Sequence, residues 1–234
     1  MASTRFEKAE QCYIFGANYT KAEFVKRDPS IKNLIFDLGG VILDLSIDHT
    51  LQAFSTLSGI EHKKVSELYT SPGFETYEKG MMTDDDFRDY VRQVFSVQCS
   101  TSEIDACWNA MLRGFPIAKL QLLQKLKEDY SVFLLSNTNS IHIKHMNQVM
   151  LPALSLPPIP LEGYFHRAYY SHIMKKRKPN ADIFQQVLSE NGLLAEQTLF
   201  LDDNLPNIEG AKQLGIKTVH VVAPDTIFEY FNEQ

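Results

Sequence analysis

The chain has 234 residues, of which 44% are hydrophobic and 22% charged, and its formal net charge is −6. This composition is typical of a globular protein with a buried core, and the length suits one large domain or a core that carries a small second domain. The acidic balance argues against a general nucleic-acid binder. No run approaches the roughly 18 apolar residues of a membrane span, and the N-terminus lacks the apolar core of a signal peptide.

The three cysteines, Cys12, Cys99 and Cys107, are too few and too scattered for a disulfide framework or a thiolate metal site. They indicate ordinary thiols in a reducing compartment, so we expect a cytoplasmic protein without a membrane partner, and the oligomeric state stays open. Residues 1–30 read as a polar, loosely packed N-terminal extension, with the folded core beginning near Ile31.

The first informative stretch is residues 33–43, in which the apolar run Leu34-Ile35-Phe36 ends in Asp37 and is followed by Gly39 and Gly40. The run predicts a buried parallel strand that delivers Asp37 to the carboxyl edge of a sheet. The glycines allow the backbone to approach a ligand closely. Alone, the pattern is weak, because an acidic residue at a strand end is more often a turn former or a helix cap.

Residues 48–112 change character, because their apolar residues recur at helical spacing and clean strand runs are absent. Thr83 followed by three aspartates, residues 84–86, predicts a capped helix rather than a metal site, since helix starts attract carboxylates. A further helix is expected from Ser102. We therefore predict an all-helical cap at 48–112, inserted into a core made of residues 31–47 and 113–234.

Beyond the cap, buried strands alternate with helical segments. Four prolines between residues 151 and 160 make that stretch a loop. The alternation predicts an α/β fold, a three-layer Rossmann-like parallel sheet with the all-α cap inserted. The further strands are expected at 130–135, 165–171, 198–201 and 217–222, and helices at 116–129, 184–191 and 208–214 and in the tail.

Polar side chains stand where these strands end. Ser136 and Asn137 follow the second strand, and the pair Asp202-Asp203 follows the fourth. Lys178 closes the run Lys175-Lys176-Arg177-Lys178, and Pro179 holds it just before a helix, so it can point back to the sheet while its neighbours stay exposed. Because the carboxyl ends of parallel strands share one edge, these groups should converge on Asp37.

Four ordered motifs give the chain a specific resemblance over residues 31–222. The stretches Phe36-Asp37-Leu38-Gly39-Gly40-Val41, Leu135-Ser136-Asn137-Thr138, Arg177-Lys178-Pro179 and Leu201-Asp202-Asp203 with Asn207 resemble the motifs of haloacid dehalogenase-like hydrolases. Within that superfamily, the glycine after Leu38 and the Arg-Lys-Pro stretch are most similar to sugar phosphatases related to alpha-D-glucose-1-phosphate phosphatase.

The resemblance implies a Mg²⁺-dependent phosphatase that acts on a small phosphorylated metabolite, with a sugar phosphate as the expected substrate. Asp37 would be the nucleophile and form an aspartyl-phosphate. Asp37, the Gly39 carbonyl and Asp202 would hold Mg²⁺, an ion that prefers oxygen ligands. The resemblance casts Ser136, the Asn137 N–H and Lys178 as ligands of the phosphoryl oxygens, and Asp203 and Asn207 as groups that orient the metal and the lysine.

One position departs from the pattern, because phosphatases of this superfamily usually carry an acid–base aspartate where this chain has Gly39. General acid–base catalysis typically raises the rate about 10²–10⁴-fold. Without the aspartate, the enzyme should therefore prefer substrates with activated leaving groups or use another group as the acid and base. Possible substitutes are Asp44, Glu75, Glu78 and a hydroxyl of the substrate itself. Aromatic and methionine side chains of the cap are candidates to line the site, although most should be cap core: Phe74, Tyr77, Met81, Met82 and Trp108.

Two alternatives follow from the missing carboxylate. A 2-haloacid dehalogenase also lacks it, but works without metal, and the acidic pair Asp202-Asp203 favours a metal. The second alternative is a phosphate-binding or regulatory protein, which would keep the shape of the site but catalyse hydrolysis only weakly.

Overall fold

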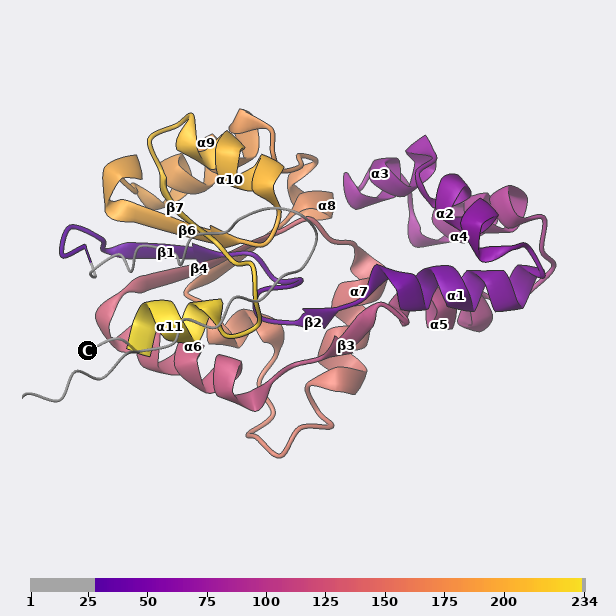
Figure 1. Cartoon of the computed structure of the whole chain (residues 1–234), viewed down its shortest axis with the longest axis horizontal. Coiled ribbons are helices and arrows are strands. Elements are labelled where there is room, and N and C mark those ends of the chain that lie inside the picture. The colour runs from indigo at the N-terminus through magenta and orange to yellow at the C-terminus, as the bar shows by residue number, and fades with distance from the viewer. Residues whose placement is uncertain (1–27, 233–234) are drawn as a thin grey trace, which may run out of the picture.

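A computed structural model describes residues 28–232, so the expectation for the N-terminal extension and for Cys12 falls almost wholly outside it. Its centre is a five-stranded parallel sheet in the order β5-β4-β1-β6-β7 (Figure 1). The predicted parallel sheet is confirmed, with boundaries shifted by a few residues. The strands are β1 (Asn33–Phe36), β4 (Ser131–Ser136), β5 (Arg167–Tyr170), β6 (Thr198–Asp202) and β7 (Lys217–His220).

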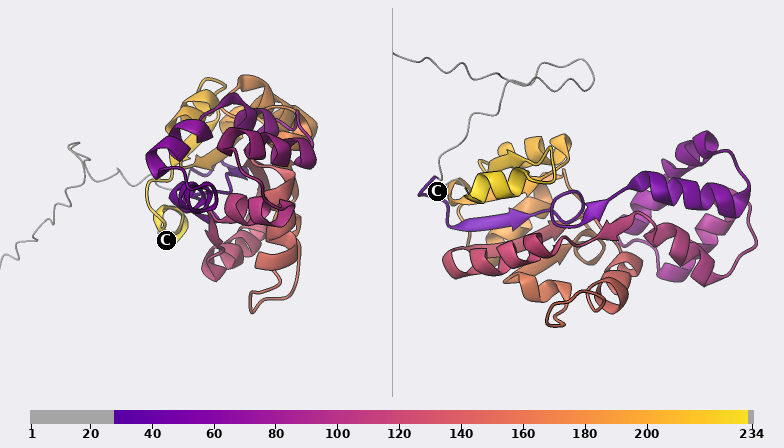
Figure 2. Two further views of the ribbon diagram at one scale, coloured as in Figure 1. Left: turned by 90° about the vertical axis from the view of Figure 1, so that its right-hand side faces the viewer. Right: turned by 60° about the horizontal axis from the view of Figure 1, so that its bottom comes forward.

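Alternating side chains of the strands give the sheet two apolar faces. Leu34 and Phe36 of β1 pack with α6 (Ile117–Asp129) and α11 (Thr226–Asn232), whereas Ile35 packs with α9 (Ala181–Asn191) and α10 (Leu205–Lys212). The helices therefore cover both faces of the sheet, as two views of the molecule show (Figures 1 and 2). Because the sheet is covered on both sides, its strands read as continuous apolar runs.

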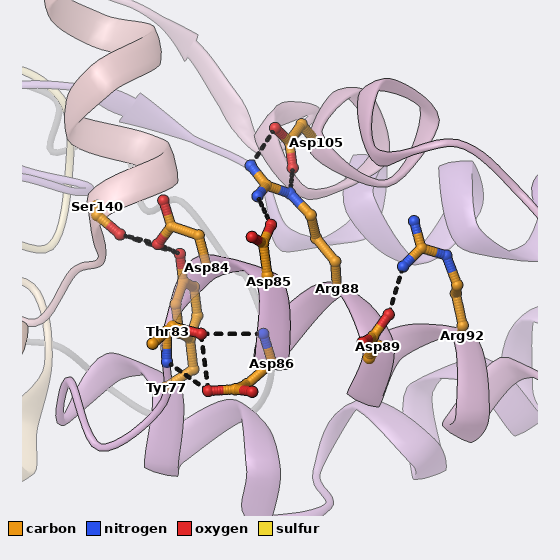
Figure 3. A network of polar contacts seen from close by, with 10 residues as sticks. All are labelled: Tyr77, Thr83, Asp84, Asp85, Asp86, Arg88, Asp89, Arg92, Asp105 and Ser140. Atoms are coloured by element: carbon orange, nitrogen blue, oxygen red, sulfur yellow. Dashed lines mark hydrogen bonds and ion pairs between the residues drawn. The ribbon is translucent and has the colours of Figure 1, made fainter.

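Five helices between β1 and α6 form a second lobe (Figure 1). Their shared core is largely aromatic, with Trp108, Phe87 and Phe74 in contact. Thr83 forms the predicted cap of α4, exchanging hydrogen bonds with Asp86 in a capping box (Figure 3). The helices are α1 (Ile47–Ser58), α2 (His62–Tyr69), α3 (Pro72–Glu78), α4 (Asp84–Phe95) and α5 (Thr101–Asn109), the last starting just before the predicted Ser102.

A short antiparallel ribbon of β2 (Asp44–Leu45) and β3 (Leu112–Gly114) joins the two lobes. This ribbon could not be predicted from the sequence, because strands of two and three residues show no alternation of apolar and polar residues. The remaining elements are α7 (Ser140–His145), its π-helical extension η1 (Met146–Met150), α8 (Ser171–Met174), η2 (Leu161–Tyr164) and η3 (Ala195–Gln197). Of the helices between residues 28 and 232, none has the length and apolar character needed to cross a lipid bilayer.

Candidate active site

Two carboxylates meet at the carboxyl edge of the sheet, where the neighbouring strands β1 and β6 end. The Asp37 N–H donates to the Leu201 carbonyl at 2.8 Å, so the pairing with β6 continues one residue past β1. Asp37 is 8% exposed and Asp202 is fully buried. Burying two acids side by side is costly unless a positive charge compensates them.

Lys178 supplies that charge. Its Nζ lies 2.7 Å from Asp37 Oδ1 and 2.6 Å from Asp202 Oδ2, and the residue is 1% exposed. Asn137 fixes the lysine from the loop after β4: its Oδ1 accepts from the Lys178 N–H and its Nδ2 donates to the Lys178 carbonyl, both at 3.0 Å. Sequence reasoning assigned Asn137 only a backbone N–H role, because nothing local in the sequence links its side chain to a segment 41 residues away.

A third acid completes a group that suits a hard cation. One carboxylate oxygen from each of Asp37, Asp202 and Asp203 lies within 4.8 Å of the others. Asn207 Nδ2 donates to both oxygens of Asp202 at 3.1 Å, which fixes that carboxylate. An all-oxygen donor set of this kind fits Mg²⁺. We expected Asp203 to orient the metal and its surroundings, and that role stays a prediction; its carboxylate lies in the same group as the other two.

Gly40 explains how Asp203 comes so close. Its backbone has φ +73°, and a Cβ at this position would overlap the Asp203 carboxylate. Only glycine can adopt this positive φ without strain and also leave space for the Asp203 carboxylate. The second glycine of the first motif therefore makes room for an acidic side chain from the end of β6.

Burial and charge perturb the titration of these groups. Burial raises the pKa of Asp37 to about 7, with Lys178 opposing the shift and Asp202 adding to it. Burial works to lower the pKa of Lys178, but the two carboxylates outweigh it, so this pKa lies above its usual value. Partial burial, followed by the charge of Asp202, raises the pKa of Asp203. Lys178 is therefore charged at neutral pH, and additional positive charge would favour the ionised form of Asp37.

Ser136 and Gly39 complete the predicted set. Ser136 is the last residue of β4, 3% exposed, on the strand that pairs with β1. A Cβ at Gly39 would meet Leu45 Cδ2 at 3.1 Å, so a leucine from the ribbon borders the position where related phosphatases carry a carboxylate. Metal ligation by the Gly39 carbonyl stays a prediction, because no contact in the structure tests it.

The three acids considered as substitutes for that carboxylate lie in different surroundings. Asp44 is exposed and 3.6 Å from Lys119 Nζ, and Glu75 is exposed and paired with Lys79 at 2.6 Å. Glu78 differs from both, because it lies at the contact between the lobes, where Arg177 Nε donates to its Oε2 at 3.1 Å. Burial raises the pKa of Glu78, although Arg177 opposes the shift.

The basic run differs from expectation in part. We expected the three bases before Lys178 to be exposed, and Lys175 is, although its Nζ donates to the Gly80 carbonyl of the other lobe. Lys176 and Arg177 are half-buried, and Arg177 is ion-paired with Glu78. The run therefore contributes contacts between the lobes. The cap aromatics Phe74, Tyr77 and Trp108 are buried within the cap core, while Met81 is 67% exposed.

The fold and the acid–lysine site define a hydrolase of the α/β class with an inserted cap, and the chain belongs to the haloacid dehalogenase-like hydrolase family, whose sequence model matches residues 34–221. A curated relative, D-ribitol-5-phosphate phosphatase of Bacteroides thetaiotaomicron, is 31% identical over 189 residues, which cover 80% of this chain and 90% of the relative.

Solved structures agree with this assignment. A HAD family enzyme of Bacteroides thetaiotaomicron, crystallised with magnesium and inorganic phosphate, is 37% identical with a TM-score of 0.75, covering 81% of this chain and 93% of that one. A predicted HAD-like family hydrolase of Porphyromonas gingivalis is 27% identical with a TM-score of 0.76, covering 88% and 100%.

Proposed function

We propose that this chain is a Mg²⁺-dependent phosphatase that hydrolyses the phosphate monoester of a small sugar or polyol through an aspartyl-phosphate on Asp37. The observation that carries the proposal is the buried group in which Lys178 bridges Asp37 and Asp202 while Asp203 lies beside them. The substrate class is inferred from the ribitol-5-phosphate phosphatase, with which this chain shares 31% identity.

In this proposal an Asp37 carboxylate oxygen attacks phosphorus, a new P–O bond forms, and the ester P–O bond breaks with its electron pair on the leaving oxygen. That oxygen takes a proton and leaves as the alcohol. Water then attacks the same phosphorus and releases phosphate and the Asp37 carboxylate. Ser136, the Asn137 N–H and the Lys178 ammonium hold the phosphoryl oxygens as charge shifts during both steps.

Asp37, Asp202 and Asp203 would hold Mg²⁺, with the Gly39 carbonyl as a predicted fourth protein ligand and Asn207 fixing the Asp202 carboxylate. The ion would offset the repulsion between an anionic nucleophile and an anionic phosphate. Lys178 already offsets part of it, since its ammonium contacts Asp37 at 2.7 Å. Proton transfer to the leaving oxygen must come from outside position 39, because glycine has no group that titrates.

Phosphate release from p-nitrophenyl phosphate and from a panel of sugar and polyol phosphates, with and without Mg²⁺, tests the proposal. We expect release that needs Mg²⁺ and that Asp37→Asn abolishes. Asp129→Asn serves as the matched control, because Asp129 is an exposed acid at the end of α6. No phosphate release by either the wild type or Asp37→Asn would favour a phosphate-binding protein, and fluoride release from fluoroacetate would favour a dehalogenase.

A further inference from the structure

The cap contacts the two loops that carry Ser136 and Lys178. Asp84 Oδ1 accepts hydrogen bonds from Tyr77 Oη at 2.7 Å and from the Ser140 hydroxyl (Figure 3). Ser140 stands four positions after Ser136 in the chain. At a second place, Arg177, the residue directly before Lys178, is paired with Glu78 of the cap. The cap segment from α3 to α4 thus bridges both loops of the candidate site.

Ser171, the first residue of α8, connects this cap segment to the core through hydrogen bonds. It is fully buried, and its hydroxyl oxygen accepts from the Thr138 N–H at 2.9 Å. The same oxygen lies 2.7 Å from the Glu78 carbonyl of the cap and 3.0 Å from the Thr138 carbonyl of the core. A hydroxyl has one proton, so it can donate fully to only one of these carbonyls at a time.

Gly80 lets the cap come this close to α8. It has φ +63°, and a Cβ there would overlap the His172 carbonyl oxygen. Lys175 Nζ donates to the Gly80 carbonyl from the other end of α8. Cap backbone and core backbone therefore meet without a side chain between them, and we call this contact the Gly80 seat: Gly80, Ser171, His172 and Lys175.

We propose that the Gly80 seat is a positioning device for the candidate active site, in which docking of the cap fixes the loop of Ser136 and Asn137 through Ser171 and Thr138. With the cap docked, the Ser171 proton is donated to the Glu78 carbonyl. When the cap leaves, the Glu78 carbonyl no longer anchors the hydroxyl, so the Ser171 side chain can rotate away from the Thr138 N–H. The hydrogen bond that holds the loop two residues beyond Ser136 is therefore weaker without the docked cap.

Gly80 and Ser171 act in this proposal as positioning residues, because neither needs to touch the substrate. The kinetic consequence rests on the proposed phosphatase function, whereas the change in the loop does not. Two pairs of variants separate the kinetic consequence from the change in the loop. Each pair consists of a test substitution and a matched control elsewhere in the chain.

The first pair is Gly80→Ala and Gly59→Ala. Both glycines lie in the cap with positive φ, +63° and +70°, so alanine brings the same backbone strain to each. A Cβ at Gly59 has nothing within 4 Å, whereas one at Gly80 meets the core. We expect Gly80→Ala to lower kcat/KM about 10–100-fold, with losses in kcat as well as KM, because small misplacements of a binding loop have effects of this size. Gly59→Ala should stay within about twofold of the wild type.

The second pair is Ser171→Ala and Thr50→Val. For both, the hydrogen-exchange rate of the Thr138 amide is measured with no substrate present. Thr50 is a buried hydroxyl of the same kind, which accepts from the Met111 N–H at 3.0 Å and donates to the Cys107 carbonyl at 2.9 Å, but it lies wholly within the cap. Relative to Thr50→Val, we expect Ser171→Ala to speed exchange at Thr138 at least about tenfold. Gly80→Ala should speed it relative to Gly59→Ala, although it leaves Ser171 intact.

The exchange result decides the proposal even if no ester is hydrolysed, so its failure is distinguishable from failure of the phosphatase function. Faster exchange at Thr138 in Gly80→Ala than in Gly59→Ala supports the seat. Equal exchange in those two variants overturns it. Equal kcat and KM for Gly80→Ala and Gly59→Ala, in an enzyme that is otherwise active, also overturns it.

Discussion

Replacing Gly39 by aspartate should give the site the acid–base group that it lacks. The residue is outside the left-handed backbone region, and its new Cβ would meet the Leu45 side chain, with Cδ2 nearest at 3.1 Å. Leu45 is 38% exposed, so the tip of its side chain can move aside. We therefore expect Gly39→Asp to fold, with a change in unfolding free energy of no more than about 1 kcal/mol.

The size of the gain follows from the chemistry of the leaving group. General acid catalysis is worth about 10²–10⁴-fold, and we expect the lower end, about 10²-fold or 2.7 kcal/mol of barrier, for a carboxylate that was not selected for this position. The gain should appear with alkyl phosphates such as polyol phosphates, whose alkoxide needs a proton. It should be small with p-nitrophenyl phosphate, whose leaving group needs little protonation.

The assay is the ratio of kcat/KM for a polyol phosphate to that for p-nitrophenyl phosphate, in the wild type, Gly39→Asp and Gly39→Asn. Asparagine has the size of aspartate but cannot transfer a proton, so it controls for packing at Leu45. The reasoning is refuted if Gly39→Asp and Gly39→Asn give the same ratio. It also fails if the wild type already hydrolyses alkyl and activated esters equally fast, because another group would then do the work of the missing acid.

Three further outcomes are expected. Lys178→Met should lower the free energy of unfolding, measured in urea without Mg²⁺, by about 3–5 kcal/mol, because it leaves two buried carboxylates without their cation; an unchanged midpoint would contradict the buried bridge. Gly40→Ala should weaken Mg²⁺ binding, measured calorimetrically, because its Cβ overlaps Asp203, whereas Gly192→Ala, with similar φ +62° and open space, should not. Burial lowers the pKa of His142 from 6.5 to about 3, so between these values the unfolded chain binds a proton that the folded chain excludes. As the pH is lowered from about 6.5 to about 3, stability should therefore decrease, by up to about 1.4 kcal/mol per pH unit, and less steeply in His142→Gln.

Much of the fold could be predicted because parallel strands covered on both faces leave a local signal, an apolar run that ends in a polar residue. Asp37, Ser136 and Asp202 each follow such a run, and their meeting at one edge follows from the topology. The β2–β3 ribbon left no such signal, because Asp44 and Leu45 form only two residues of strand. The approach of Asp203 to Gly40 also needed the folded backbone, since the two residues are far apart in the sequence.

Contacts between the lobes could not be predicted, because they depend on how two separately packed units meet. Asp84 was interpreted as part of a helix start, and it does begin α4, but its carboxylate also accepts hydrogen bonds from Tyr77 and Ser140 (Figure 3). Arg177 was expected to be exposed because a run of four bases is usually solvated. No role for Ser171 could be predicted, since a serine at the end of an apolar strand has no distinguishing sequence pattern.

An aspartyl-phosphate on Asp37 can be trapped during turnover. The enzyme would be mixed with Mg²⁺ and a ³²P-labelled ester, quenched in acid during turnover, digested, and the labelled peptide sequenced. We expect label on the peptide that contains Asp37, released by hydroxylamine as expected of an acyl phosphate and absent in Asp37→Asn. Steady turnover with no label on the protein, or with label on another residue, would contradict it.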